Sequence, residues 1–313
     1  MSDLIKHLSK FTNQLEMHSL GVALSGGGDS LALCITLKNA KIPFKALHFN
    51  HHLRPEADAE AAWLEKLCKE RHIPFYSQTW QSPKSTKGNI QQLARRARYA
   101  FLNDAAKKLE IKHIFTAHTA DDVVETTLMR LFYGSGSQGL AKMRQKVRKN
   151  SYTLHRPLLD FSREDLRTYL QKNHQIWLED PSNYNTDYVR VRARYWLKEM
   201  PNDIQSALLE LAEGCAQLEE ALKTQLLPYK DYIVKNKNNW AVINSAVLSL
   251  PDYARHRLFK DVFQTLQPQR HLPRPEKQKR LFSVLECENA HHHVGQIQFE
   301  RQGQKIVAKP KNE

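Results

Sequence analysis

The chain has 313 residues, which is longer than one typical domain and predicts two. Hydrophobic residues make up 41% and charged residues 26%, so a packed core is expected and wholesale disorder is excluded. Lys and Arg outnumber Asp and Glu by 47 to 33, and the net charge of +14 favours a polyanionic partner such as nucleic acid.

The first half of the sequence alternates short apolar runs with segments of helical period, which is typical of a parallel sheet with crossover helices. Strands are expected at 20–24, 44–50, 75–80 and 113–118, and helices at 30–40, 56–71 and 89–109. The fold class is therefore α/β. Because such strands place their carboxyl ends at one edge of the sheet, we expect the ligand site there.

The alternation weakens in the second half. A helix is expected after the cap residue Ser162, and two more follow up to about residue 226. Further helices at 252–266 and 275–285 and a hairpin over 296–307 predict a smaller, largely helical α+β domain. We expect a catalytic domain over residues 1–205 and a second domain with a helical linker over 206–313.

Other signals narrow the class of protein. The N-terminus has no signal peptide and no run of about 18 apolar residues occurs, so we expect a cytoplasmic protein with no membrane association. The four cysteines form no C-x-x-C pair, which argues against a zinc ribbon or a cysteine-ligated cluster. The tract His291–His293 has no second ligand pair and is interpreted as structural.

A glycine-rich loop lies between the first strand and the first helix, with the residues Ser25, Gly26, Gly27, Gly28, Asp29 and Ser30. Consecutive glycines let successive backbone N–H groups point inward, and the helix adds its positive dipole end, so the loop predicts a phosphate site. Both serines offer hydroxyl groups, and Asp29 is the expected Mg²⁺ ligand. The alternative, a turn followed by a plain helix cap, is disfavoured by the strand–glycine–helix order.

Two other nucleotide motifs are excluded by context. The segment Gly134–Gly139 spells G-x-G-x-x-G, but it follows a helical stretch and not a strand, as a dinucleotide site would require. It also lacks the lysine of a G-x-x-x-x-G-K-S/T loop. Its glycines are still expected to shape a loop near the site.

The glycine-rich loop resembles the pyrophosphate loop, or PP-loop, of the ATP pyrophosphatases. Further segments are similar, in order, to motifs of the tRNA(Ile)-lysidine synthetases, also called synthases: His48–Arg54, Ala94–Tyr99, Thr116–Thr126, Arg156–Leu159 and Glu179–Asn183. The match covers roughly residues 20 to 200, and the combination is far more specific than any single motif. It implies the PP-loop fold, and the length fits the short form with one small, tRNA-binding C-terminal domain.

The resemblance implies a ligase that depends on ATP and Mg²⁺. Members attach free L-lysine to the wobble cytidine of an isoleucine tRNA with a CAU anticodon, through an adenylated cytidine, and release pyrophosphate and AMP. This chemistry needs a phosphate cradle, a divalent cation, a protein cation at the α-phosphate and an anionic site for lysine. The implied partners are that tRNA and free lysine, and the oligomeric state, a homodimer included, stays open.

Candidate residues follow from the matched motifs. Asp122 and Glu125 lie three apart at a helix start and are expected to bind lysine or accept a proton from its amine. Without the resemblance, complementing the helix dipole would be the simpler interpretation. Two further sets are expected: His51, His118 and Asp121 near the nucleotide, and Arg95, Arg98, Arg190 and Arg194 at phosphate or tRNA.

Three positions depart from the family pattern. Thr119 stands where a histidine is common, Val123 where a glutamine is common, and Val191 in place of an asparagine. No role of those lost side chains is carried over. The phosphate loop and the acidic pair are intact.

Other functions stay open on the sequence alone. A tRNA thiolation enzyme of the same superfamily would activate a base similarly, but the missing C-x-x-C pair counts against it. Basic residues cluster at 84–98, 142–149, 190–194 and 270–280, as expected for a surface that follows a nucleic-acid backbone. An enzyme that adenylates a small molecule fits these basic clusters less well. A non-catalytic RNA-binding module would explain the charge but would need neither the glycine-rich loop nor the acidic pair.

Overall fold

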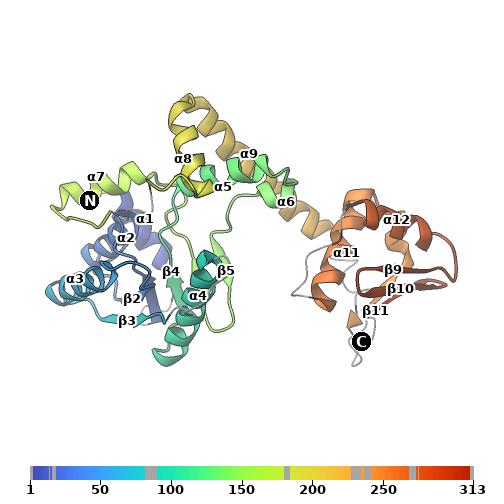
Figure 1. Ribbon diagram of the computed structural model, residues 1–313, viewed down its shortest axis with the longest axis horizontal. Helices are drawn as coiled ribbons and strands as arrows, with labels where there is room; N and C mark the ends of the chain where they lie inside the picture. The colour runs from blue at the N-terminus through green and yellow to red at the C-terminus, as the bar shows by residue number, and fades with distance from the viewer. Residues whose placement is uncertain are drawn as a thin grey trace. The chain divides into compact units, whose positions relative to one another are not determined.

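The computed structural model describes residues 3–13, 15, 19–81, 90–179, 184–226, 234–235, 241–267, 273 and 275–310. The chain divides into two compact units, Met1–Ala216 and Gln217–Glu313 (Figure 1). The boundary expected at residue 205 falls inside helix α9 (Asn202–Gln225), because the helix continues through that position. Several residues of the sequence predictions lie outside the described ranges: Lys84, Lys87, Asp180–Asn183, Arg270 and Arg274.

A six-stranded sheet forms the centre of the first unit, with strand order β3-β2-β1-β4-β6-β5. Five strands are parallel: β1 (Leu20–Ala23), β2 (Lys45–Asn50), β3 (Phe75–Thr79), β4 (His113–Phe115) and β6 (Thr153–His155). Strand β5 (Lys146–Arg148) is antiparallel to β6 at the edge. The α/β class and the four expected strands are confirmed. The β5–β6 pair was not expected, because three-residue strands are too short to show a period of two.

Helices cover both faces of this sheet. Helix α2 (Gly28–Asn39) packs with α1 (Asp3–Thr12), α3 (Ala57–Glu70) and α7 (Arg163–Lys172) in one apolar cluster, to which Val22 and Ala46 of the strands belong. Helix α4 (Ile90–Lys108) packs on the other face with the neighbouring strand residues Ala23 and Leu47. This alternation along each strand explains why β1, which is buried on both faces, is apolar throughout.

A group of helices follows strand β4. It contains α5 (Ala120–Phe132), the single turn α6 (Ser137–Leu140), α7 and α8 (Val189–Glu199). Helices α5 and α8 pack through Val124 and Leu128 against Ala193 and Leu197. The predicted cap of α7 is confirmed, since the Ser162 hydroxyl accepts from the Asp165 backbone N–H at 3.1 Å.

The second unit has a five-stranded antiparallel sheet with the order β7-β8-β11-β10-β9. Its strands are β7 (Val234–Lys235), β8 (Ala241–Asn244), β9 (His291–Val294), β10 (Ile297–Gln302) and β11 (Lys305–Pro310). The 3₁₀ helix η3 (Ser245–Ser249) and helices α11 (Asp252–Leu266) and α12 (Pro275–Leu285) complete it, with Phe259 and Phe299 fully buried. The predicted hairpin is confirmed, and the histidine tract forms strand β9.

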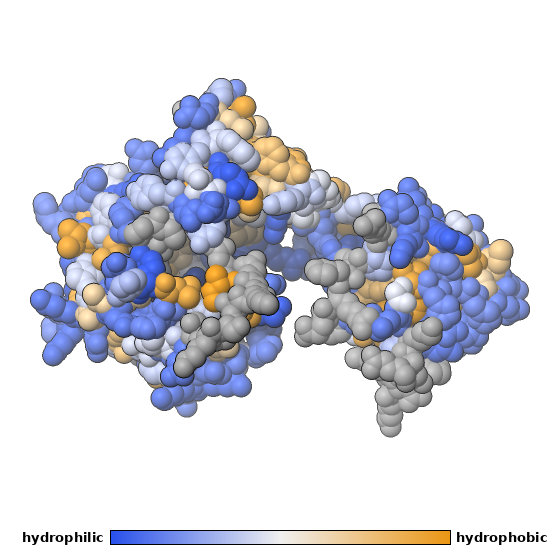
Figure 2. Space-filling view, in the orientation of Figure 1, coloured by the Kyte–Doolittle hydropathy of each residue, from blue (hydrophilic) through white to orange (hydrophobic). Residues whose placement is uncertain are grey.

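The surface in view in Figure 2 is mostly hydrophilic, in keeping with the high content of charged residues. Hydrophobic side chains are exposed over the region of α8 and α9, where Trp196, Ile204 and Leu211 are each about 40% exposed. Within the described part of the chain, each helix is too short or too polar to cross a membrane.

Candidate functional site

The glycine-rich loop connects β1 to α2 at the carboxyl edge of the sheet. Gly26 adopts a φ of +92°, and a side chain there would begin 2.9 Å from Cδ1 of Leu178, so both conformation and space require glycine. The Leu178 backbone N–H donates to the Gly26 carbonyl at 3.1 Å, and Gly27 pairs with Leu178 in an isolated bridge. The segment around Leu178 therefore holds the loop in one shape.

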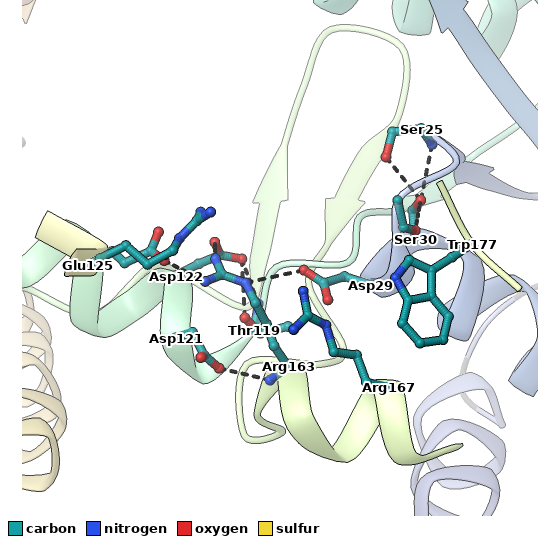
Figure 3. A network of polar contacts seen from close by, with 12 residues as sticks. Ser25, Asp29, Ser30, Thr119, Asp121, Asp122, Glu125, Arg163, Arg167 and Trp177 are labelled. Atoms are coloured by element: carbon teal, nitrogen blue, oxygen red, sulfur yellow. Dashed lines mark hydrogen bonds and ion pairs between the residues drawn. The ribbon is translucent and has the colours of Figure 1, made fainter. Parts of the chain in front are cut away.

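The two serines of the loop have different roles in its geometry. Ser30 is buried, donates its hydroxyl to the Gly27 carbonyl at 3.0 Å and accepts from the Ser25 backbone N–H at 3.1 Å. Because a hydroxyl has one proton, Ser30 can only accept from the Ser25 hydroxyl, 3.0 Å away (Figure 3). Ser30 closes the loop from inside, whereas Ser25 is exposed.

A cleft of about 440 Å³, here called the loop cleft, brings together ten of the expected site residues. They are Ser25, Gly27, Gly28, Asp29, Ser30, Arg98, His118, Asp122, Arg190 and Arg194. An adjoining cavity of about 640 Å³, here called the β2 cavity, lies at the end of β2 and includes His51 and Arg95. Ser25 and Arg98 line both spaces, so the two lie side by side.

Asp29 is the carboxylate of the loop that faces the rest of the site. Burial raises its pKa to about 6, an effect that Arg163 opposes and Asp122 reinforces. The Arg163 Nε lies 3.5 Å from Asp29 Oδ2. A hard divalent cation fits such a carboxylate, since Mg²⁺ binds through one or two carboxylates and phosphate oxygens. The described residues contain no group of three or more His, Cys, Asp or Glu that could hold a metal.

Three arginines and two acids form one ionic network at the start of α5, and Figure 3 labels its members Asp122, Glu125 and Arg163. Arg163, the first residue of α7, donates from Nη2 to Asp122 Oδ1 at 2.7 Å and from Nη1 to Glu125 Oε1 at 2.5 Å. Arg190 of α8 reaches the same two acids at 2.8 and 2.7 Å. Arg194, one turn further along α8, donates to Glu125 Oε1 at 2.8 Å. Acids of α5 are thus bound to cations of α7 and α8.

Glu125 lies at the buried end of this network, with its side chain 1% exposed. Burial by itself would raise the pKa of Glu125, but hydrogen bonds and charge from Arg163, Arg194 and Arg190 outweigh it and lower the pKa to about 2. A carboxylate with so low a pKa is a weak proton acceptor at neutral pH. The geometry therefore favours charge compensation by Glu125 over proton transfer.

Asp122 has both carboxylate oxygens in use. Its Oδ2 accepts from the Thr119 backbone N–H at 2.9 Å, which forms part of the N-terminal cap of α5. Its Oδ1 accepts from Arg163 and Arg190. A lysine ammonium group would reach Asp122 Oδ1 directly only by replacing a guanidinium group.

The three departures from the family pattern have structural explanations. Thr119 is fully buried and is the cap residue of α5, a position that threonine fills well. Val123 packs against Leu159 in a buried cluster, and Val191 is 5% exposed. These apolar positions would not satisfy a polar amide without a partner.

A second cavity of about 580 Å³, here called the α7–α8 cavity, also borders the ionic network. Arg163 and Arg194 line both this cavity and the loop cleft. Asp121, expected near the nucleotide, lines the α7–α8 cavity and not the loop cleft. Its Oδ2 accepts from the Arg163 backbone N–H at 2.8 Å, so Asp121 holds the amino end of α7.

The remaining expected residues are distributed around the two adjoining spaces. Burial lowers the pKa of His118 to about 4, against the attraction of Asp122, so its imidazole is neutral at pH 7. The His118 Nδ1 lies 3.0 Å from the Thr116 hydroxyl. His51 packs edge-on against Phe49 in the β2 cavity, with ring centroids 4.9 Å apart.

Sequence reasoning missed three side chains of the site. Arg163 is the centre of the network, Arg167 lines both the loop cleft and the α7–α8 cavity, and Trp177 lies beside Gly28. The signal for Arg163 was its place directly after the cap Ser162. That signal identifies a helix start, but it does not show that the helix points its first side chain toward α5.

Comparisons with known proteins show the family of this chain. Residues 1–200 match a family described as a PP-loop domain. The tRNA(Ile)-lysidine synthase of Chlamydia pneumoniae is 35% identical over 237 residues, which cover 73% of this chain and 74% of that protein. The tRNA(Ile)-lysidine synthase of Ruegeria pomeroyi is 37% identical over 226 residues, which cover 70% of this chain and 54% of that protein.

The match spans only about half the length of some relatives, such as 52% of the tRNA(Ile)-lysidine synthase of Orientia tsutsugamushi. Among solved structures, the U34-tRNA thiolase NcsA from Methanococcus maripaludis superposes with a TM-score of 0.59 at 15% identity, over 70% of this chain and 79% of that chain. A likeness at this identity shows the fold alone.

The loop glycines generate a first prediction. Gly26→Ala should lower the free energy of unfolding by about 1–3 kcal/mol, because it forces a side chain into a left-handed conformation against Leu178. Gly27→Ala should leave stability near that of the wild type, since its nearest neighbour would be the Ser25 Oγ at 3.7 Å. Gly27→Ala should nevertheless weaken ATP binding roughly tenfold, because a methyl group keeps phosphate from the backbone. Urea unfolding and calorimetric titration with ATP measure the two effects, and equal ATP affinity in Gly27→Ala would contradict the cradle.

The ionic network generates a second prediction. A carboxyl whose pKa is lowered on folding stabilises the folded protein above its unfolded pKa, here about 4.5, and this contribution is lost as the pH falls toward about 2. For Glu125 the contribution is on the order of 3 kcal/mol. Stability measured by urea unfolding should therefore fall less steeply with acid in Glu125→Gln than in the wild type. The exposed Glu65→Gln serves as control, and a wild-type slope in Glu125→Gln would argue against the network.

Proposed function

We propose, since the chain belongs to the PP-loop family and within it to the tRNA(Ile)-lysidine synthases, that it ligates free L-lysine to the wobble cytidine of an isoleucine tRNA with a CAU anticodon. The observation that carries the proposal is the meeting of the glycine-rich loop, Asp29 and the arginine–carboxylate network at one cleft. ATP activates the cytidine, and the reaction takes place in the cytoplasm.

The nucleotide fits the two adjoining spaces in this proposal. Backbone N–H groups of Gly27 and Gly28 and the positive end of α2 would hold the triphosphate in the loop cleft. The β2 cavity, with His51 at its wall, has room for the adenosine. Mg²⁺ held by Asp29 and phosphate oxygens would neutralise charge that develops on the phosphates.

In the first step the cytosine O2 attacks the α-phosphorus, and the bond from that phosphorus to the bridging oxygen breaks as pyrophosphate leaves. Negative charge grows on the phosphate oxygens and must be met by cations that are already in place. Arg98 and Arg190 line the loop cleft, and the side chain of Arg190 is 41% exposed. Arg190 would exchange its bonds to Asp122 and Glu125 for bonds to a phosphate group, and its partial exposure lowers the desolvation cost of that exchange.

In the second step the lysine ε-nitrogen attacks C2 of the adenylated base, and the bond from C2 to the oxygen of AMP breaks. The amine gives up a proton to solvent or to a carboxylate that is not already tightly paired. Asp122 and Glu125 can attract the cationic amino acid when one of the three arginines moves to phosphate, because the network then carries less positive charge. Glu164 and Lys198 in the α7–α8 cavity offer further charges of both signs to an amino acid.

The second unit would bind the tRNA backbone. Arg255 and Arg257 of α11 form ion pairs with acids of the same unit, so their charge is partly compensated. The basic residues of α12 are exposed, with Lys277, Lys279 and Arg280 on its surface. Helix α12 is therefore the better candidate for phosphate contacts, which position an RNA without reading its sequence.

The described residues of this site offer no cysteine for the thiolation alternative. Cys34 and Cys68 are buried in the apolar core, and no cysteine lines the loop cleft or the α7–α8 cavity among the described residues. The likeness to a U34-tRNA thiolase is limited to the fold, so it gives no evidence of a sulfur nucleophile in this chain.

A labelling assay tests the proposed reaction. With ATP and Mg²⁺, radiolabelled lysine should enter the CAU-anticodon isoleucine tRNA and should not enter the initiator methionine tRNA, which has the same anticodon. Asp29→Ala should release no pyrophosphate above background while keeping its affinity for tRNA. Label in both tRNAs, or in neither, would refute the assignment.

Asp122→Asn separates the two steps. The amide can still accept the cap hydrogen bond of α5 but carries no charge toward lysine, so formation of the adenylated tRNA should persist while the KM for lysine rises at least tenfold. Adenylation is measured as pyrophosphate release in the absence of lysine. The KM for lysine is measured by titration with lysine. An unchanged KM for lysine would show that Asp122 does not attract the amino acid.

A further inference from the structure

Three large aromatic side chains are exposed at the far ends of the helices that carry the ionic network. Phe132 and Tyr133, at the end of α5, are 62% and 69% exposed, and Trp196 of α8 is 43% exposed. Phe132 and Trp196 contact each other edge to face, with ring centroids 5.0 Å apart. We call these three residues the aromatic platform, and a group of exposed aromatic side chains is a candidate binding surface.

The platform is continuous with the site already described. Helices α5 and α8 pack side by side, so the contact of Asp122 with Arg190 at one end is matched by the contact of Phe132 with Trp196 at the other. At 1.5 Å per residue, Phe132 lies about 15 Å along α5 from Asp122. This is within reach of nucleotides that flank a base held in the loop cleft.

Charge next to the platform suits a phosphate backbone. Arg192 is four residues before Trp196 and therefore shares its face of α8. Its Nη1 donates to the carbonyl groups of Thr186 and Asp187, at 2.8 and 3.1 Å, and these bonds hold the guanidinium group in place. Because carbonyl groups are neutral, these two bonds do not compensate its positive charge. An aromatic face beside a fixed cation is the combination that single-stranded nucleic acids bind.

An exposed glycine that follows Tyr133 closely in the sequence also fits a bound RNA strand. Gly136 is exposed, has a φ of −72°, and a side chain there would meet nothing within 4 Å. Gly136 is the N-cap of α6, a position that glycine fills well, and it leaves the backbone there open to the close approach of a bound strand.

We propose that the aromatic platform stacks the unpaired bases that flank the modified cytidine in the anticodon loop. The proposal rests on the proposed function for its RNA. Stacking uses the ring faces of Phe132, Tyr133 and Trp196, while Arg192 contacts a phosphate group and Gly136 allows the strand to lie close. A protein partner would cover the same side chains by apolar burial, which a leucine partly preserves, whereas stacking of a base needs the ring itself.

Paired variants of the full-length protein distinguish these occupants. Trp196→Leu keeps an apolar side chain but removes the ring, whereas Trp196→Phe keeps a ring. Fluorescence anisotropy with a labelled CAU anticodon stem-loop should give a Kd about 5- to 150-fold weaker for Trp196→Leu and close to wild type for Trp196→Phe. Leu and Phe variants of Tyr133 should behave in the same way. ATP affinity and thermal unfolding should stay near wild type, since Trp196 does not line the loop cleft.

Two further readouts identify stacking and charge separately. The fluorescence of a 2-aminopurine placed beside the wobble cytidine should be quenched when the wild type binds. Binding of Trp196→Leu should quench it less. Arg192→Gln should reduce the slope of log Kd against log salt concentration by about 0.7 for one phosphate contact, and Trp196→Leu should not change it. Gly136→Ala should weaken RNA binding without loss of stability.

The outcomes separate the platform from the enzyme activity. If Trp196→Leu binds the stem-loop as tightly as the wild type while lysine incorporation continues, the platform proposal is wrong and the proposed function stands. Equal affinities in the Leu and Phe variants would likewise reject stacking. If the wild type neither binds this RNA nor incorporates lysine, the proposed function fails and the platform proposal with it.

Discussion

The arrangement of the site depends on the neutralisation of two nearly buried carboxylates. Glu125 and Asp122 could not stay ionised in a low-dielectric environment without cations, and the arginines come from α7 and α8, far away in the sequence. Pairing therefore fixes these helices against α5. The same pairing keeps the pKa of Glu125 low, so that Glu125 is a fixed negative charge and not a proton acceptor at neutral pH.

A second constraint joins the glycine-rich loop to this network. Leu178 occupies the space that a side chain at Gly26 would need, and Arg163 lies between Asp29 and the acids of α5. The loop is thus preorganised on one side by backbone contacts and on the other by charge. Preorganised dipoles and charges are what a transfer reaction at phosphorus requires, since little reorganisation remains to be done during the step.

Helices α5 and α8 serve two purposes with one packing interface. Their apolar contacts, through Leu128 and Leu197, set the spacing that both the ionic contacts and the aromatic contact share. Under the proposed function, the polar end would serve the chemistry and the aromatic end would bind an RNA loop. The positions of the bound strand and of the reactive groups would then depend on the same few core residues.

The sequence by itself determined the α/β class, the main strands and helices, and the glycine-rich loop, because periodicity and turn chemistry are local. It also identified Asp122, Glu125, Arg190 and Arg194 through motifs of a known family. Only the tertiary structure decided that these four meet, that Arg163 joins them, and that Asp121 instead holds the start of α7. The direction of a side chain depends on how distant helices pack, and no local pattern encodes that packing. For the same reason Thr119, a departure from the family pattern, proved to be a helix cap only once its hydrogen bonds were seen.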